Sequence, residues 1–403
     1  MKTTVTILFL TCGLSLANAQ SLTECIATAR EHNIGVKMAD LKVQRAKNME
    51  GGYFEMDNTE LSLSQDPTSG GSPDNALTLS QRFDFPTVYR SRKRLLQAET
   101  QVEASRRRLT ESELTRDVSE AYCKLLYWQH IESLLIRNDS VVDAFVRTAG
   151  TRFENGETNR LELMNARRMK AKNTMRLMEV RSEKAAAALM LQQLMNIPDP
   201  VVATDDFQCV KAVGGIYSFA ATPQGQLMES ELTRSERQLN YAGQGMMPSL
   251  NVGLRHQLVI SGINPYNVDR SRFEKGNWMG FEVGVAFPLF YGTQKAKKSA
   301  ARLDVDLARA GKELAEQTSG TELLVAENAV GTARSSYDYY QEEGLPSASE
   351  MRRLSCVEYD AGEITYVEHV QNLSTALNVE MDGAKATDAL NQAIIQLNFI
   401  KGE

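Results

Sequence analysis

The sequence predicts an α+β protein in which one unit, a β-hairpin followed by very long helices, occurs twice. Three observations predict this fold class. A motif returns at a nearly constant offset, four short segments alternate apolar and polar residues, and long stretches contain few helix breakers. A motif that returns at a fixed offset indicates a duplicated structural unit.

Residues 1–19 have the features of a secretory signal peptide. Lys2 precedes an apolar stretch at 5–16, and Ala17-Asn18-Ala19 offers small residues at the spacing that signal peptidase reads. We therefore expect export and cleavage after Ala19. The remaining sequence has no apolar run long enough for a transmembrane helix. The formal net charge is −6, and removal of residues 1–19 changes it to −7, which argues against a nucleic-acid partner.

Two sequence matches define the repeat. Arg-Phe-Glu-Asn-Gly-Glu at 152–157 returns as Glu-Tyr-Asp-Ala-Gly-Glu at 358–363, an offset of 206. Phe-Pro-Thr-Val-Tyr at 85–89 returns as Phe-Pro-Leu-Phe-Tyr at 287–291, an offset of 202. We interpret the chain as a signal peptide (1–19), a first structural repeat (20–200), an equatorial linker (201–223) and a second structural repeat (224–403).

Each repeat is predicted to begin with a helix, at 21–49 and 224–241, and to continue with a β-hairpin, at 59–85 and 249–288. The hairpin segments alternate with a period of two, so each strand has one apolar face. Four such strands cannot close a barrel alone and would leave their apolar faces exposed. Three copies could pool about twelve strands, an even number within the range of bacterial outer-membrane barrels.

Long helices are predicted after each Phe-Pro element. Residues 87–149 contain no Gly or Pro, and 293–357 contain few, which allows helices of roughly 90–100 Å. Seven-residue spacing along these helices indicates coiled-coil packing. It relates Leu95, Val102 and Leu109; Ala98, Ser105, Ser112 and Ser119; and Met164, Ala171, Met178 and Ala185.

Glycines are predicted to end the long helices, and a second helix is predicted to follow each of them. Gly150 and Gly156 stand at the first end and Gly362 at the second, because glycine readily adopts the left-handed conformation that terminates a helix. Thr158 and Thr365 are the expected N-caps of the helices that follow. Each repeat should therefore carry a helical hairpin, with its tip near 150–158 or 358–365.

These features together resemble the outer-membrane factors of tripartite efflux and type I secretion systems, the TolC family. The specific element is an aromatic residue, a glycine three residues later and an acid six residues after the glycine. Here it is carried by Phe153, Gly156 and Glu162, and again by Tyr359, Gly362 and Glu368. The Phe-Pro turn after the second strand of each repeat is the other shared signature.

The resemblance implies a homotrimer with a shared 12-stranded β-barrel in the outer membrane and an α-helical barrel in the periplasm. It implies a periplasmic adaptor and an inner-membrane pump as partners, with outer-membrane lipid around the barrel. The expected adaptor-docking tips are Phe153, Gly156, Glu157, Tyr359, Gly362 and Glu363. The expected periplasmic gate is formed by Glu162 and Glu368, because carboxylate rings in a narrow pore select against anions.

The sequence offers less support for other classes of function. The four histidines form no metal-binding spacing, and no nucleophile, Walker or dinucleotide motif occurs, so we expect no catalytic, cofactor or metal site. The sixteen methionines could suggest copper handling, but their helical spacing favours packing. A soluble periplasmic coiled-coil adaptor or scaffold remains the alternative. The cargo is open between metal cations, drugs and proteins, and we favour a pump of the resistance-nodulation-division (RND) type that exports metal cations or drugs.

Overall fold

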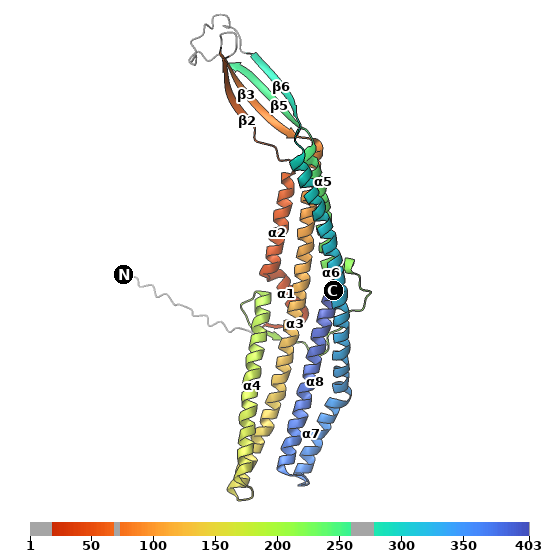
Figure 1. The fold of residues 1–403 in the computed structure, drawn as a ribbon. Coiled ribbons are helices and arrows are strands. Elements are labelled where there is room, and N and C mark those ends of the chain that lie inside the picture. The colour runs from red at the N-terminus through yellow and green to blue at the C-terminus, as the bar shows by residue number, and fades with distance from the viewer. Residues whose placement is uncertain (1–17, 68–72, 259–277, 403) are drawn as a thin grey trace, which may run out of the picture. The chain divides into compact units, whose positions relative to one another are not determined.

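The computed structural model describes residues 18–67, 73–258 and 278–402 (Figure 1). The predicted signal peptide therefore lies outside the described residues except for its last two positions. The helices are α1 (Leu22–His32), α2 (Ile34–Glu50), α3 (Pro86–Glu154), α4 (Arg160–Met195), α5 (Pro223–Gly243), α6 (Gly292–Tyr339), α7 (Leu345–Asp360) and α8 (Tyr366–Lys401). The strands are β1 (Asn18–Gln20), β2 (Glu60–Pro67), β3 (Pro73–Asp84), β4 (Val201–Ala203), β5 (Ser249–Leu258) and β6 (Trp278–Ala286).

The chain forms two compact units, and each takes segments from both predicted repeats. The first unit comprises the N-terminal residues up to Met38, together with Arg108–Pro223 and the chain from Gln317 onward. The second unit comprises Ala39–Arg107 and Gln224–Glu316. The two compact units therefore do not coincide with the two predicted sequence repeats.

The second unit contains an antiparallel sheet with the strand order β2-β3-β5-β6. All four strands lie in segments where period-two alternation predicts them. The two hairpins join into one sheet because β3 pairs with β5, with Phe83 opposite Leu250. Within the described residues, β2 and β6 each have one partner strand, so each leaves one edge unpaired.

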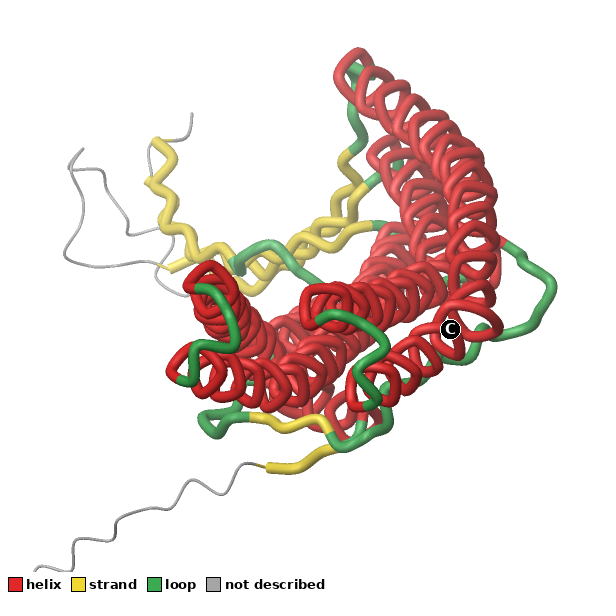
Figure 2. The backbone as a smooth tube through the Cα atoms, turned by 90° about the horizontal axis from the view of Figure 1, so that it is seen from below, coloured by secondary structure: helices red, strands yellow, loops and turns green. Residues whose placement is uncertain are grey.

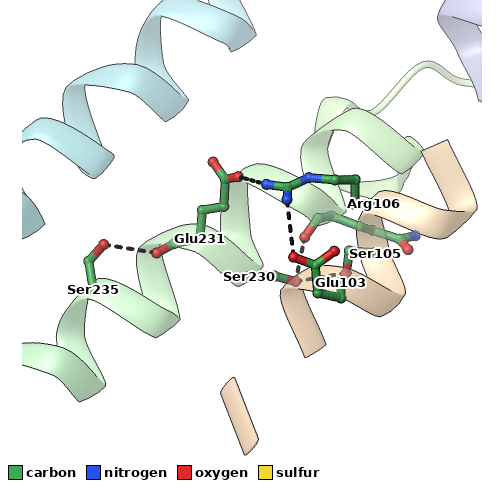
Figure 3. Close-up of polar contacts among 7 residues, drawn as sticks. Glu103, Ser105, Arg106, Ser230, Glu231 and Ser235 are labelled. Atoms are coloured by element: carbon green, nitrogen blue, oxygen red, sulfur yellow. Dashed lines mark hydrogen bonds and ion pairs between the residues drawn. The ribbon is translucent and has the colours of Figure 1, made fainter. Parts of the chain in front are cut away.

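Helix α5 packs on α3 through a polar seam in the second unit (Figure 3). The Ser105 and Ser230 hydroxyls lie 2.9 Å apart, and Ser105 is only 1% exposed. Beside them, the Arg106 guanidinium donates to Glu231 at 2.9 Å and lies 3.2 Å from Glu103. The small residue predicted at this seam therefore allows two helices to approach closely.

In the first unit, four helices lie side by side in the order α4, α3, α8, α7 (Figure 1), and Figure 2 shows the same helices from below. Lys170 of α4 pairs with Asp139 of α3 at 2.7 Å. Lys124 of α3 pairs with Asp388 of α8 at 2.9 Å. Arg352 joins α7 to α8 at 2.7 Å from a Glu380 carboxylate oxygen. Two helical hairpins, α3–α4 and α7–α8, are thereby held together through α3 and α8.

The structure also has a short strand pair that the sequence does not predict. β1 pairs with β4 in parallel over three residues, with Gln20 opposite Ala203. The expectation of about four strands was therefore too low, because a three-residue strand is too short to show alternation. The linker beyond β4 is bound to the helices: Val210 donates its amide to Asn391 at 2.7 Å, and Val213 donates to Asn398 at 3.0 Å.

Several predicted helix ends were wrong. Gly150 lies inside α3, which continues to Glu154. The N-cap of α4 is Asn159 rather than Thr158, because the Asn159 side chain accepts the amide of Glu162. The first predicted helix is divided at Asn33, whose extended backbone separates α1 from α2.

The second long helix is interrupted by a π-helical turn at Tyr340–Gly344, between α6 and α7. Pro346 is the second residue of α7, which begins immediately after that turn. Proline has no backbone amide to donate to a helical hydrogen bond, and the wider π-helical turn before Pro346 accommodates the missing bond. No helix among the described residues has the length and apolarity of a membrane span.

The predicted seam on α4 does not pack against any other described part of the chain. Met164, Ala171, Met178 and Ala185 are all exposed. The buried face of α4 is instead the opposite one, which is formed by Ala166, Asn173, Val180 and Ala187 at the same seven-residue spacing. Helix α4 thus carries two heptad faces, of which α3 covers one.

Candidate functional sites: the hairpin tips and the sheet

Both helical hairpins turn at a glycine with a left-handed backbone, with φ of +76° at Gly156 and +75° at Gly362. The amide of each glycine donates to the carbonyl three residues earlier at 3.0 Å, and the next amide donates to the carbonyl five residues earlier at 2.8 Å. This pair of bonds is the Schellman motif. No neighbouring atom lies within 4 Å of an added Cβ, so the backbone conformation alone requires glycine at both tips.

The two tips differ in charge. Residues 147–162 contain three arginines and three glutamates, whereas 353–368 contain one arginine and four acids, so the net charges are 0 and −3. In the first tip, Arg152 lies 3.8 Å from Glu157 and 3.7 Å from Glu162. The residue 206 positions after Arg152 is Glu358, which reverses that charge in the second tip.

The aromatic residues of the two motifs are also placed differently. Phe153 is 40% exposed at the end of α3. Tyr359 is partly buried, and its ring stacks on His369 with centroids 4.6 Å apart. Glu157 and Glu363, which follow the two glycines, are both exposed.

A buried polar pair supports the second tip. The Ser355 hydroxyl lies 2.8 Å from Nδ1 of His369, which is 5% exposed. Phe145 of α3 contacts His369 edge-on at 5.2 Å and Tyr366 at 5.0 Å. Burial lowers the pKa of His369 from its usual value, while Ser355 and the charge of Asp360 act in the opposite direction. The burial of the imidazole therefore favours its neutral form.

The corresponding pair in the first tip is apolar. Ala149 and Leu163 stand 206 positions before Ser355 and His369, and both are buried, with Ala166, in one small cluster. Sequence reasoning did not identify this difference. The equivalence of Leu163 and His369 becomes visible only when the two glycine motifs are aligned.

Glu162 and Glu368 occupy the same position, the third residue of their helices. Glu368 forms a capping box with Thr365, in which each side chain bonds the other residue's backbone amide. These bonds to Thr365 lower the pKa of Glu368. Glu162 accepts from the Thr158 hydroxyl and lies beside Arg152. Both carboxylates thus stabilise a helix start near a tip.

The sheet presents one apolar and one polar face. Residues directly opposite one another share a face, and one row across all four strands reads Leu61, Leu79, Leu254 and Phe281. Their exposed fractions are 65, 42, 50 and 82%. The neighbouring row, on the other face, reads Ser62, Thr78, Arg255 and Gly280.

This apolar face is unusual for a sheet in contact with water. Monomeric soluble proteins rarely expose a continuous apolar surface of this kind, and such surfaces indicate a membrane or a partner. The unpaired edges of β2 and β6 indicate further strand pairing. In the part of the chain that the structure describes, no group of three His, Cys, Asp or Glu side chains could hold a metal ion.

Comparison with solved structures shows which proteins share this fold. A search with protein-family models gave no match, and neither did a search of curated protein sequences. Among solved structures, the Campylobacter jejuni CmeC outer membrane channel matches with a TM-score of 0.77 and 16% identity, over 94% of this chain and 85% of that one. This chain has the fold of an outer-membrane channel.

Two further channel structures support that assignment. The structure of CusC, described in connection with transmembrane channel formation, matches with a TM-score of 0.78 and 17% identity, over 96% of this chain and 93% of that one. The open state of the Neisseria gonorrhoeae MtrE outer membrane channel matches with a TM-score of 0.75 and 17% identity, over 94% and 88%. The fold of the single chain expected from the resemblance to the TolC family is therefore confirmed.

Proposed function

We propose that this protein is a non-enzymatic subunit of an outer-membrane export channel. The observation that carries the proposal is the four-stranded sheet, which has one continuous apolar face and two unpaired edges in a chain with the outer-membrane-channel fold. Three copies would pair β6 of one with β2 of the next and close a 12-stranded barrel, with the apolar face toward lipid and the polar face toward the lumen. The helical hairpins would form a periplasmic α-helical barrel.

We also propose that the chain consists of an export signal followed by two related repeats. Residues 1–19 would direct export and be removed, and residues 20–200 and 224–403 would be two copies of one ancestral unit. The matching Schellman bonds at Gly156 and Gly362 support the duplication, because they recur at the offset of the sequence motif.

The hairpin tips are proposed to dock a periplasmic adaptor that connects the channel to an inner-membrane pump of the RND type. Gly156 and Gly362, with Glu157 and Glu363 beside them, lie on exposed turns with fixed backbone geometry. The cargo is proposed to be metal cations or drugs. Glu162 and Glu368 are proposed to border the periplasmic entrance, and their role in helix capping is compatible with a position close to the tips.

Fractionation and conductance test the channel itself. The expressed protein should appear in the outer-membrane fraction, require detergent for extraction and have the mass of a trimer. A soluble periplasmic monomer would instead support the alternative, a coiled-coil adaptor. In planar bilayers, Glu162→Arg combined with Glu368→Arg should change conductance and reduce cation preference. Unchanged selectivity would assign both residues to helix capping alone.

A second experiment tests docking at the tips. Gly156→Trp combined with Gly362→Trp should leave the trimer assembled and abolish export, because two bulky side chains would cover the docking turns. Gly156→Ala combined with Gly362→Ala is the matched control, since it strains the same two left-handed positions without adding a bulky side chain. Export by the double variant equal to that of the control would refute docking at these glycines.

A further inference from the structure

The apolar face of the sheet runs into a pocket at the end that adjoins the helices. Phe83, Leu250 and Val285 lie opposite one another at that end of β3, β5 and β6. Each stands four residues along its strand from the apolar row that contains Leu79, so both rows share one face. Leu250 and Val285 are 41 and 61% exposed. The pocket therefore opens onto the surface that the proposed channel turns toward lipid.

Aromatic and proline side chains form the rest of the pocket wall. The pocket has a volume of about 530 Å³, and Phe54, Phe85, Pro86, Tyr89 and Pro248 complete its lining. The rings of Phe54 and Tyr89 lie 4.5 Å apart. Pockets that bind small molecules typically have volumes of about 300–1,000 Å³ and mostly apolar walls. The size and the lining of this pocket thus suit an apolar ligand.

Two polar groups of the lining are already engaged within the chain. The Tyr89 hydroxyl accepts a hydrogen bond from the backbone amide of Asp84 at 2.9 Å. The Ser249 hydroxyl accepts one from the Arg82 guanidinium at 3.0 Å. With these groups engaged, the lining offers a ligand mostly apolar surface, and a polar ligand would bury groups without partners. A hydrocarbon chain has no such groups.

Cationic side chains follow the pocket along α3. Residues 86–94 contain four Lys and Arg and no acid. Arg90 stands one helical turn after Pro86, and Lys93 stands one turn after Tyr89, so both continue the helical wall of the pocket. Both cations are exposed. Cations beside an apolar pocket match a ligand that has an anionic head and an apolar chain.

We infer that the pocket binds one acyl chain of an anionic glycerophospholipid, with the lipid phosphate at Arg90 and Lys93. The inference rests on the proposed channel and adds a lipid site to it. The helix end of the sheet is the periplasmic end in that arrangement, so the lipid comes from the inner leaflet. Its chain enters the pocket next to the headgroup and continues along the apolar face. Each methylene removed from water strengthens binding by about fourfold.

Native mass spectrometry of the detergent-solubilised full chain tests the site, with dioleoyl phosphatidylglycerol as the probe. Binding should saturate at three lipids per trimer, one for each copy. Val285→Trp and Leu250→Trp each place a ring in the pocket and should weaken binding to the intact trimer by about tenfold or more, as expected for the loss of roughly two buried methylenes. Val283→Trp and Val252→Trp are the matched controls. These positions lie on the same strands and the same face, outside the pocket lining, and binding should be unchanged.

A second pair of variants tests the headgroup contact. Arg90→Gln combined with Lys93→Gln should reduce the preference for phosphatidylglycerol over dioleoyl phosphatidylcholine, whose headgroup has no net charge. Lys295→Gln combined with Lys298→Gln is the control, because it removes the same charge at the start of α6, outside the pocket lining. An unchanged preference in the first pair, or an equal loss in both pairs, would overturn the headgroup contact.

The particle mass in the same spectra separates this inference from the proposed function. A trimer that binds no phosphatidylglycerol, as expected if a neighbouring copy covers the pocket, would overturn the lipid site and leave the channel standing. Binding that does not saturate at three, or that the tryptophans at 285 and 250 weaken no more than those at 283 and 252, would overturn the site as well. A protein that is monomeric in detergent would overturn both proposals.

Discussion

At the tip of the α3–α4 hairpin, Ala149 and Leu163 pack as an apolar pair, whereas the corresponding positions of the α7–α8 hairpin hold the hydrogen-bonded pair Ser355 and His369. The two tips nevertheless end their helices with the same hydrogen bonds around a glycine of the same φ. Backbone termination is thus common to both tips, while the packing behind them is not.

This difference shows that the backbone of the turn and the side chains behind it are constrained in different ways. A helix can reverse within a few residues only if its last carbonyls are satisfied, and the Schellman motif does this with one glycine. The side chains behind the turn need only fill the same volume, so a polar pair replaces an apolar pair if its hydrogen bond is made. One tip therefore has an apolar support and the other a titratable one.

The largest effect should come from Phe145, which supports the second tip alone. Phe145→Ala removes a ring that is 7% exposed and contacts both Tyr366 and His369. We expect a local destabilisation of about 3–5 kcal/mol. Hydrogen exchange should accelerate at 355–373 and remain unchanged at 159–166. Equal acceleration at both tips would show that they open as one unit.

A smaller and symmetrical effect is expected at the glycines. Gly156→Ala and Gly362→Ala should each cost about 1–2 kcal/mol, because a side chain is strained at these φ values. Asn is the matched control, since it tolerates the left-handed region better and should cost less at both positions. Thermal unfolding and local hydrogen exchange of the single variants would measure these losses of stability. A clearly larger loss at one glycine than at the other would contradict the conclusion that both tips share one backbone conformation.

The smallest effect is a pH dependence confined to the second tip. The pKa of His369 is lowered by burial, so its contribution to stability is complete above 6.5, the usual pKa, and is lost as pH falls through the lowered value. Asp360, Tyr359 and Tyr366 are the other titratable groups around it. Below pH 6.5, hydrogen exchange corrected for its intrinsic rate should rise at 355–373.

The first tip supplies the control for that measurement. His369→Leu combined with Ser355→Ala installs the pair that supports the first tip and should remove the pH dependence. A pH-dependent rise that persists in this double variant would assign the titration to another group.

Much of this fold could be predicted because its elements carry strong periodic signals. Period-two alternation located all four strands of the sheet, since one face is apolar and the other polar. The glycines located both tips, because only the left-handed turn requires glycine there. Heptad spacing identified Ala98 and Val102 as buried on α3.

The rest could not be predicted, for reasons that are local. Three-residue strands such as β1 and β4 are too short to show a period-two alternation of apolar and polar residues. Spacing alone could not decide which heptad face of α4 packs within the chain, because Met164 and Ala166 belong to equally regular series on opposite faces. The burial of His369 depends on Phe145, more than 200 residues away, so no local pattern indicates it.

The order of strands in the sheet also governs how the chain must fold. Arg82 of β3 bonds Ser249 of β5 across a sequence separation of 167 residues. Closing so long a loop makes strand pairing slow compared with hairpin formation. The first hairpin therefore emerges with an apolar face and an open edge well before its neighbour is synthesised. The apolar face and the open edge of β3 therefore stay exposed until β5 has been synthesised and can pair with it.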